Sequence, residues 1–308
     1  DAINVHLENG DLQFNTRGWC RFELTRKAML KSVEKFLKLF IPPVFSHLWR
    51  KIRPRRIRGH LIFAPDGSNT QIKASEKGWD SEYIVADMER EIDSFARRCR
   101  GAGPLSFTHL SSESKSENPL RLHNLHMTWA YVIALASRNK EAISILDWGG
   151  GLGHFYQLAR AVLSEDALDY HCKEIPSTVN VGRRINSAVT WYDDEACLVR
   201  TFDLILVSGS LQYMENWAGF LGKLAAIADD YLLLLRTPVV DEGDGFYAIQ
   251  RIGETELLHQ LFSEPEILAV MDDFGFSLVR EFFDGSRLRI VQAEIECELK
   301  GWLFQKKT

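Results

Sequence analysis

A glycine-rich turn between two apolar stretches constrains the fold of this chain more than any other feature. The turn reads DWGGGLG from Asp147 to Gly153 and fits the pattern D-x-G-x-G-x-G. Glycines permit a tight turn and let the backbone approach a ligand with no Cβ in the way. A helix that starts directly after such a turn presents free N–H groups toward the same ligand. The sequence therefore predicts a strand–loop–helix unit that binds a ligand at its loop.

The rest of the chain around and after this turn alternates apolar strands with helices. This alternation is typical of a parallel sheet with crossover helices. We therefore predict an α/β fold, with a Rossmann-like, mostly parallel seven-stranded sheet that has helices on both faces and follows a helical N-terminal region. The strands are expected at 143–148, 168–175, 188–192, 202–207, 231–235, 277–283 and 298–304, and the helices at 155–163, 217–227 and from 264 to Gly275.

Composition divides the chain into three expected parts. Residues 1–60 form a basic amphipathic arm, 61–140 a helical cap region and 141–308 the ligand-binding domain. Within the cap region a helix is expected at 80–98. A second helix is expected after Asn118-Pro119, where asparagine can cap the helix and proline can occupy its first position.

Two acidic residues near the turn indicate which ligand it binds. Asp147 stands two residues before the first glycine, where its carboxylate can meet the ammonium group of S-adenosylmethionine (SAM). Glu174 ends the second strand, about twenty residues after the turn, where an acid can accept hydrogen bonds from both ribose hydroxyls. A dinucleotide-binding G-x-G-x-x-G would require glycine at the position of His154. The pattern therefore favours SAM over NAD.

Further cofactor contacts are expected at the carboxyl ends of neighbouring strands, which line the ligand crevice of an open α/β sheet. Small residues after the fourth strand leave space beside the sulfur. Asp193, after the third strand, can bond the adenine amino group, or it can belong to a solvated turn. The predicted cofactor-binding residues are Asp147, Gly149, Gly150, Gly151, Gly153, Glu174, Asp193, Ser208 and Gln212.

The stretch from 143 to 217 resembles SAM-dependent methyltransferases of the class I fold. The matching pieces are LDWGGGLG at 146–153, Glu174-Ile175-Pro176 with Gly182-Arg183, and SGSLQY at 208–213. More narrowly, roughly residues 60 to 308 are similar to a little-characterised bacterial family associated with surface-polysaccharide biosynthesis. The resemblance implies SAM as the cofactor and leaves the acceptor open. From the family association we expect a small-molecule or glycan acceptor, methylated at oxygen.

An oxygen acceptor has to lose its proton during transfer, which requires a nearby base. His154 and His171 are the nearest candidates by sequence, and the alternative for each is a structural role. No metal site is expected, because His123 and His126 have no third ligand in view. Two other function classes stay open. One is an NAD-dependent oxidoreductase, and the other is a non-catalytic scaffold protein with the same fold.

Charge and cysteine usage suggest where the protein works. The net charge of −5 gives no reason to expect nucleic-acid binding. Five dispersed cysteines without a CxxC pair suggest reduced thiols and a cytoplasmic location. Residues 21–58 combine an excess of Lys and Arg with an apolar stripe, as in helices that lie on anionic membranes. We expect this segment to contact the inner face of the membrane or a partner enzyme, with a solvated helix or linker as the alternative.

Overall fold

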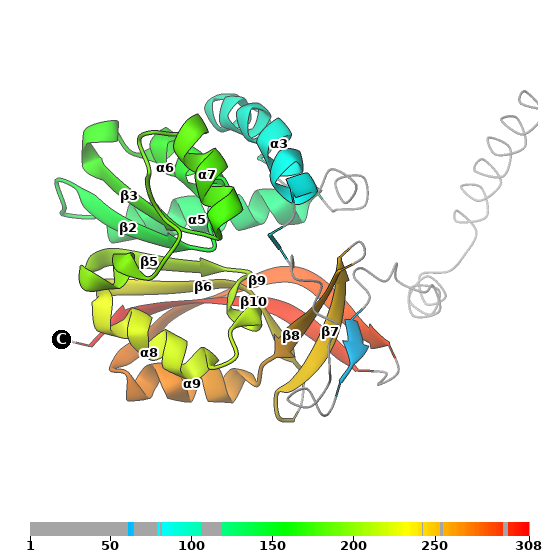
Figure 1. The fold of residues 1–308 in the computed structure, drawn as a ribbon. Helices are drawn as coiled ribbons and strands as arrows, with labels where there is room; N and C mark the ends of the chain where they lie inside the picture. Colours follow the sequence, from blue (N-terminus) through cyan, green and yellow to red (C-terminus); the bar gives the residue numbers. More distant parts are fainter. Residues whose placement is uncertain are drawn as a thin grey trace, which may run out of the picture. The chain divides into compact units, whose positions relative to one another are not determined.

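The computed structural model describes residues 61–64, 79–80, 82–105, 119–241, 243–252, 255–291 and 295–307. All of them belong to one compact unit of residues 57–308 (Figure 1). The basic segment expected at 21–58 lies outside the described residues. The helices are α3 (Glu82–Arg100), α5 (Pro119–Ala136), α6 (His154–Val162), η1 (Glu165–Ala167), α7 (Pro176–Ile185), η2 (Ala196–Val199), η3 (Leu211–Tyr213), α8 (Trp217–Ile227) and α9 (Glu264–Asp273).

The strands form one continuous sheet in the order β4-β3-β2-β5-β6-β10-β9-β1-β7-β8. The first seven of these are the predicted mostly parallel sheet, since only β10 among them runs antiparallel to its neighbours. The strands are β1 (Leu61–Phe63), β2 (Ile143–Trp148), β3 (Leu168–Lys173), β4 (Thr190–Tyr192), β5 (Phe202–Ser208), β6 (Ala228–Val240), β7 (Phe246–Ile252), β8 (Thr255–Leu261), β9 (Phe276–Val291) and β10 (Glu296–Lys306).

Strand β2 lies at the point where the strand order changes direction. Its neighbours are β3 on one side and β5 on the other, and it runs parallel to both. Trp148 at its carboxyl end is in register with Lys173 of β3 and Val207 of β5. The carboxyl ends of all three strands therefore meet at one edge, which is where open α/β sheets bind ligands.

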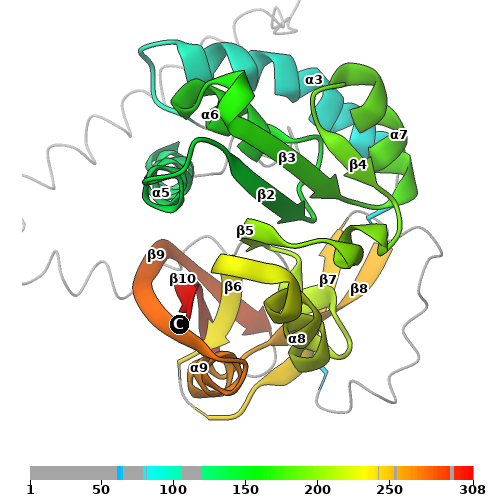
Figure 2. The same ribbon diagram turned by 90° about the vertical axis from the view of Figure 1, so that its left-hand side faces the viewer.

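Apolar side chains alternate between the two faces of these central strands, so each face can bury its own layer of helices. Helices α3, α5, α6 and α7 pack on one face and α8 and α9 on the other (Figure 2). The first face receives Ile145, Leu204, Leu206, Leu233 and Leu235, and the second receives Leu146, Ile205, Val207, Leu232 and Leu234.

The sheet extends beyond the seven predicted strands. Strands β7 and β8 form an antiparallel hairpin, and β1 pairs with β7 and β9. Strand β6 is also longer than its apolar stretch, because it continues past Leu235 and pairs with β10 as far as Val240. This extension places further strands of the sheet beside the carboxyl end of β5.

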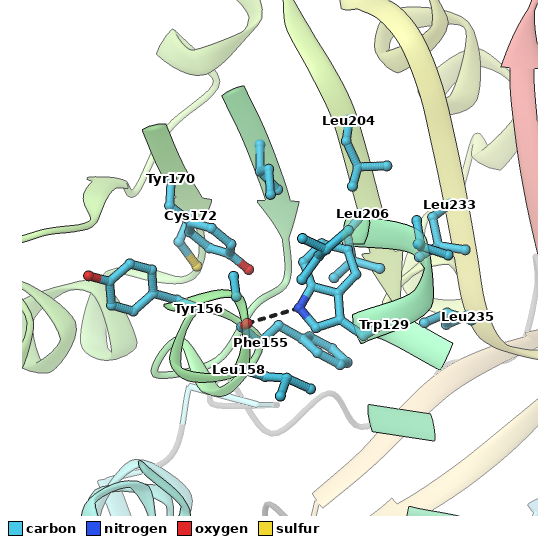
Figure 3. Packing of buried hydrophobic residues seen from close by; sticks show 14 of the residues in the cluster. Trp129, Phe155, Tyr156, Leu158, Tyr170, Cys172, Leu204, Leu206, Leu233 and Leu235 are labelled. Atoms are coloured by element: carbon cyan, nitrogen blue, oxygen red, sulfur yellow. Dashed lines mark hydrogen bonds between the residues drawn. The ribbon is translucent and has the colours of Figure 1, made fainter. Parts of the chain in front are cut away.

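Trp129 fixes helix α5 to the sheet and to α6. Its side chain is fully buried, and its indole N–H donates to the carbonyl oxygen of Phe155 at 2.9 Å (Figure 3). The two rings also meet edge to face, with centroids 5.5 Å apart. Since Phe155 belongs to the first turn of α6, this contact also supports the helix that starts from the glycine loop.

We predict that Trp129→Ala lowers the free energy of unfolding by about 3–5 kcal/mol, because it leaves a large cavity and removes the hydrogen bond to Phe155. Met127→Ala on the same helix is the control, since Met127 is 48% exposed and should change the free energy by less than about 1 kcal/mol. Urea unfolding followed by circular dichroism measures both. Equal losses in the two variants would contradict this role of Trp129.

Candidate active site

The glycine loop joins β2 to α6 through a series of left-handed residues. Gly149, Gly151 and Gly153 have φ of 78°, 59° and 80°, a region that glycine adopts without steric cost. The loop also touches the turn after β5, because a Cβ on Gly149 would lie 2.8 Å from the Cβ of Ser210. Only glycine therefore permits this close approach of the two segments at the edge of the sheet.

Asp147 lies beneath the loop and is fully buried. A Cβ on Gly150 would come within 2.3 Å of Asp147 Oδ2, so this glycine leaves room for the carboxylate. The hydroxyl of Tyr170 donates to Oδ2 at 2.7 Å, whereas Oδ1 is buried and has no hydrogen-bond partner among the described residues. Burial raises the pKa of Asp147 to about 7. One carboxylate oxygen is thus left for a ligand.

Glu174 follows β3 and lies against the glycine loop. Its Oε1 accepts the backbone N–H of Gly151 at 3.0 Å, and its Oε2 accepts the N–H of Ile175 at 2.8 Å. Burial raises the pKa of Glu174, and the two backbone N–H groups act in the opposite direction. A carboxylate offers about four acceptor sites, so this acid can still accept from a ligand hydroxyl.

The turn after β5 supplies polar atoms at the same edge. Ser208 ends the strand, and its Oγ is buried without a hydrogen-bond partner in the described part of the chain. Gln212 donates from Nε2 to the carbonyl of Gly209 at 2.9 Å, and its Oε1 is likewise buried and unpaired. Ser210 donates to the carbonyl of Trp148 at 3.0 Å, which ties this turn to the end of β2.

Asp193 is placed differently from the other predicted cofactor residues. It is exposed after β4, and the nearest contact of its carboxylate is the guanidinium of Arg183 at 3.6 Å. Its neighbour Asp194 accepts the backbone N–H of Ala196 at 2.9 Å, as in a capped turn. These contacts fit the solvated-turn alternative, so Asp193 stays a proposal for the adenine site.

The two candidate bases occupy different surroundings. His154 begins α6 directly after the loop, with its ring among those of Phe95, His126 and Phe155. His171 lies on the opposite face of the sheet from Asp147, where Nε2 is 2.8 Å from Asp169 and Nδ1 is 3.0 Å from the Tyr192 hydroxyl. Because both of its ring nitrogens are engaged, the contacts of His171 indicate a structural histidine.

A polar cluster that the sequence did not predict lies beside this edge. The hydroxyl of Tyr213, on η3, donates to Oε1 of Gln250 at 2.7 Å, and Nδ1 of His259 lies 3.1 Å from the same oxygen. An amide oxygen only accepts, so this arrangement gives His259 a proton on Nδ1. Burial lowers the pKa of His259 to about 3, which keeps its ring neutral. The short apolar runs in 246–252 and 255–261, which do not alternate regularly with polar residues, were the available signal for the hairpin that carries Gln250 and His259.

A glycine loop with one buried acid beneath it and a second acid bound to its backbone, at the switch point of this sheet, defines a class I SAM-dependent methyltransferase. A family model described as a methyltransferase domain matches residues 121–281, which is more than half of the chain. The chain therefore belongs to this family of methyltransferase domains and uses SAM as its cofactor. No sequence relative was found among curated proteins.

Several solved methyltransferases are similar in structure. Magnesium protoporphyrin IX methyltransferase from Synechocystis PCC 6803 with bound SAM has 15% identity and a TM-score of 0.43, covering 74% of this chain and 98% of that chain. The N-terminal domain of EvdMO1 with S-adenosylhomocysteine (SAH) bound has 15% identity and a TM-score of 0.45, covering 71% and 97%. The 1,6-didemethyltoxoflavin-N1-methyltransferase of Burkholderia thailandensis has 16% identity and a TM-score of 0.40, covering 64% and 85%.

The raised pKa of Asp147 predicts how stability depends on pH. Since the folded protein holds this pKa near 7, above the usual aspartate value of 3.8, the stability that Asp147 contributes is full at low pH and is lost as pH rises through the folded pKa. The free energy of unfolding contributed by Asp147 should fall by on the order of 2–4 kcal/mol between pH 5 and 8. Urea unfolding at several pH values measures this loss, and Asp147→Asn should abolish it.

Asp203→Asn is the control for this prediction. The ammonium and hydrogen bonds of Lys140 and Ser144 lower the pKa of Asp203, so its contribution is lost as pH falls below the usual aspartate range. The Asp203 variant should therefore lose as much free energy of unfolding between pH 5 and 8 as the wild type does. If the free energy of unfolding changed equally with pH in the wild type and in Asp147→Asn, Asp147 would already be ionised in the folded protein.

Proposed function

We propose that the protein transfers a methyl group from SAM to an oxygen atom of a small-molecule or glycan acceptor. The observation that carries the proposal is a set of buried polar atoms at the carboxyl ends of β2 and β5 that have no hydrogen-bond partner among the described residues. They are Asp147 Oδ1, Ser208 Oγ and Gln212 Oε1. Buried polar atoms are ordinarily hydrogen-bonded, so their grouping beside a glycine loop supports a site for a polar ligand.

The residues at this edge fit the parts of an adenosyl cofactor. Asp147 would face the ammonium group, and Glu174 would accept from the ribose hydroxyls. Gly149, Gly150, Gly151 and Gly153 would present backbone without side chains, and Ser208 and Gln212 would line the space beside the sulfur. Asp193 is proposed for the adenine amino group.

SAM supplies a methyl group on a positively charged sulfur, and that group reacts by in-line displacement. The contribution of the protein is to hold the acceptor in line and to keep water away. The turn after β5 and the Tyr213–Gln250–His259 cluster are the polar groups that could orient an acceptor hydroxyl. Of the two candidate bases we retain His154, because it directly follows the glycine loop. His171 is not retained as a candidate base.

The acceptor class can be tested by measuring SAH release with nucleotide sugars, oligosaccharides and lipid-linked sugars. Mass spectrometry of the product should then show one added methyl group as an ether. Release of SAH without a methyl ether would contradict oxygen as the target. NAD binding without a response to SAM or SAH would favour an oxidoreductase, and SAH binding without turnover on any acceptor would favour a scaffold protein.

The proposed cofactor contacts predict the effect of two substitutions. Gly151→Val should abolish SAH binding while the protein stays folded, because a side chain there would intrude where the backbone meets the ligand. Glu174→Ala should weaken SAH binding by about 1.5–3 kcal/mol, the value of a charge-assisted hydrogen bond. Calorimetry measures both, with Glu195→Ala as the control because Glu195 is exposed and forms an ion pair with Lys223. Wild-type affinity for SAH in both the Gly151 and the Glu174 variant would place the cofactor elsewhere.

Surface-polysaccharide biosynthesis and a cytoplasmic location at the inner face of the membrane remain part of the proposal. In the part of the chain that the structure describes, no helix is both long and apolar enough to cross a membrane. Attachment would instead depend on the basic residues of 21–58, each worth about 1 kcal/mol near an anionic surface.

The role of residues 21–58 can be tested by comparing the full chain with a chain that starts at Gly59. We predict that both bind SAH equally and that only the full chain sediments with anionic liposomes, less so at high salt. Loss of SAH binding on truncation would show that the segment belongs to the catalytic fold. Equal sedimentation of both chains would leave a partner enzyme as its target.

A further inference from the structure

Arg236 occupies a strained position at the edge where the cofactor residues lie. The parallel pairing of β5 with β6 ends at Ser208 and Leu235, and Arg236 is the next residue of β6. Its φ is 55°, in the left-handed region that non-glycine residues rarely adopt. The register of β10 shifts between Lys300 and Trp302, near the same point. Such strained residues are often found at ligand sites.

The guanidinium of Arg236 lies against the turn that follows β5. A Cβ on Gly209 would be 3.4 Å from Arg236 Cζ and 3.5 Å from its Nε. The backbone N–H of Gly209 also donates to the carbonyl of Leu235 at 2.9 Å, which holds the two segments together. Arg236 is therefore a neighbour of Ser208 and Gln212, two of the proposed cofactor residues.

The charge of Arg236 has no counterpart in the described part of the chain. No carboxylate there forms an ion pair with it, and its Nε is buried without a hydrogen-bond partner. The charge instead acts on His126 of α5, whose pKa is lowered to about 4 by burial and, to a smaller extent, by the nearby charge of Arg236, so that ring is neutral. A partly buried cation without a negative neighbour is costly unless a ligand supplies the negative charge.

We propose that Arg236 binds a carboxylate or phosphate group of a molecule held in the active-site crevice. The anion belongs either to the acceptor or to the amino-acid part of the adenosyl cofactor, and the inference rests on the proposed function. A guanidinium suits this role because its planar N–H groups can bond both oxygens of a carboxylate or phosphate at once. The left-handed backbone directs this side chain over Gly209.

The test uses Arg236→Asn, because asparagine tolerates the left-handed region and removes the charge. Arg184→Asn is the matched control, since Arg184 is 63% exposed and pairs with Glu89 on α3. Calorimetry compares SAH with 5′-methylthioadenosine, which lacks the amino-acid part. Thermal unfolding of the SAH-saturated protein compares inorganic phosphate with chloride at equal ionic strength.

Two results support the proposal and identify the source of the anion. If Arg236 binds the cofactor carboxylate, Arg236→Asn lowers the affinity for SAH by at least about tenfold and leaves the affinity for 5′-methylthioadenosine unchanged. If Arg236 binds the acceptor, Arg236→Asn binds SAH and 5′-methylthioadenosine as tightly as the wild type does. Phosphate then raises the melting temperature of the wild type and of the Arg184 variant but not that of Arg236→Asn.

The proposal is overturned if Arg236→Asn matches the wild type in SAH affinity and in its response to phosphate. Arg236→Gln, of similar length but uncharged, takes the place of the asparagine variant if that variant does not fold. Failure of the wild type to bind SAH would instead contradict the proposed function. In that case the phosphate comparison on the protein alone still decides whether Arg236 binds an anion.

Discussion

The hydrogen bond from the Gly151 backbone to Glu174 is the contact on which the geometry of the site depends. It joins the glycine loop after β2 to the residue that follows β3, across two neighbouring parallel strands. Asp147 supports the same loop from below, where the absence of a Cβ on Gly150 leaves space for its carboxylate. Both acids are removed from water by this packing, and burial raises the pKa of each. A positively charged ligand group would offset that cost for Asp147.

The sheet brings a second group of residues to the same edge from distant parts of the sequence. Arg236 comes from the bend in β6, and Gln250 and His259 come from the hairpin that follows it. The turn after β5 connects the two groups, because Gly209 lies against Arg236 and Tyr213 bonds Gln250. The turn after β5 is therefore bonded to the end of β2 on one side and to β6 and β7 on the other.

The fold was largely predictable because its central strands are short apolar stretches punctuated by glycine and proline. The position of Glu174 at the same edge as the glycine loop was also predictable, since parallel neighbouring strands bring their carboxyl ends together, whereas its hydrogen bond to Gly151 was not predicted. Strands β7 and β8 were missed because their apolar residues do not alternate regularly with polar ones. Arg236 gave no signal, since neither its left-handed φ nor its missing counter-ion is visible in sequence. The role of His171 depended on which face of β3 it occupies, and spacing alone did not decide that.

The central claim is that the loop from Asp147 to Gly153, with Glu174, binds the adenosyl cofactor. A crystal structure of the protein grown with SAH tests this most directly. The account predicts electron density for SAH along the carboxyl ends of β2, β3 and β5, with the ribose hydroxyls bonded to Glu174 and the amino group beside Asp147. Density for SAH at any other surface, with the glycine loop free of ligand, would contradict it.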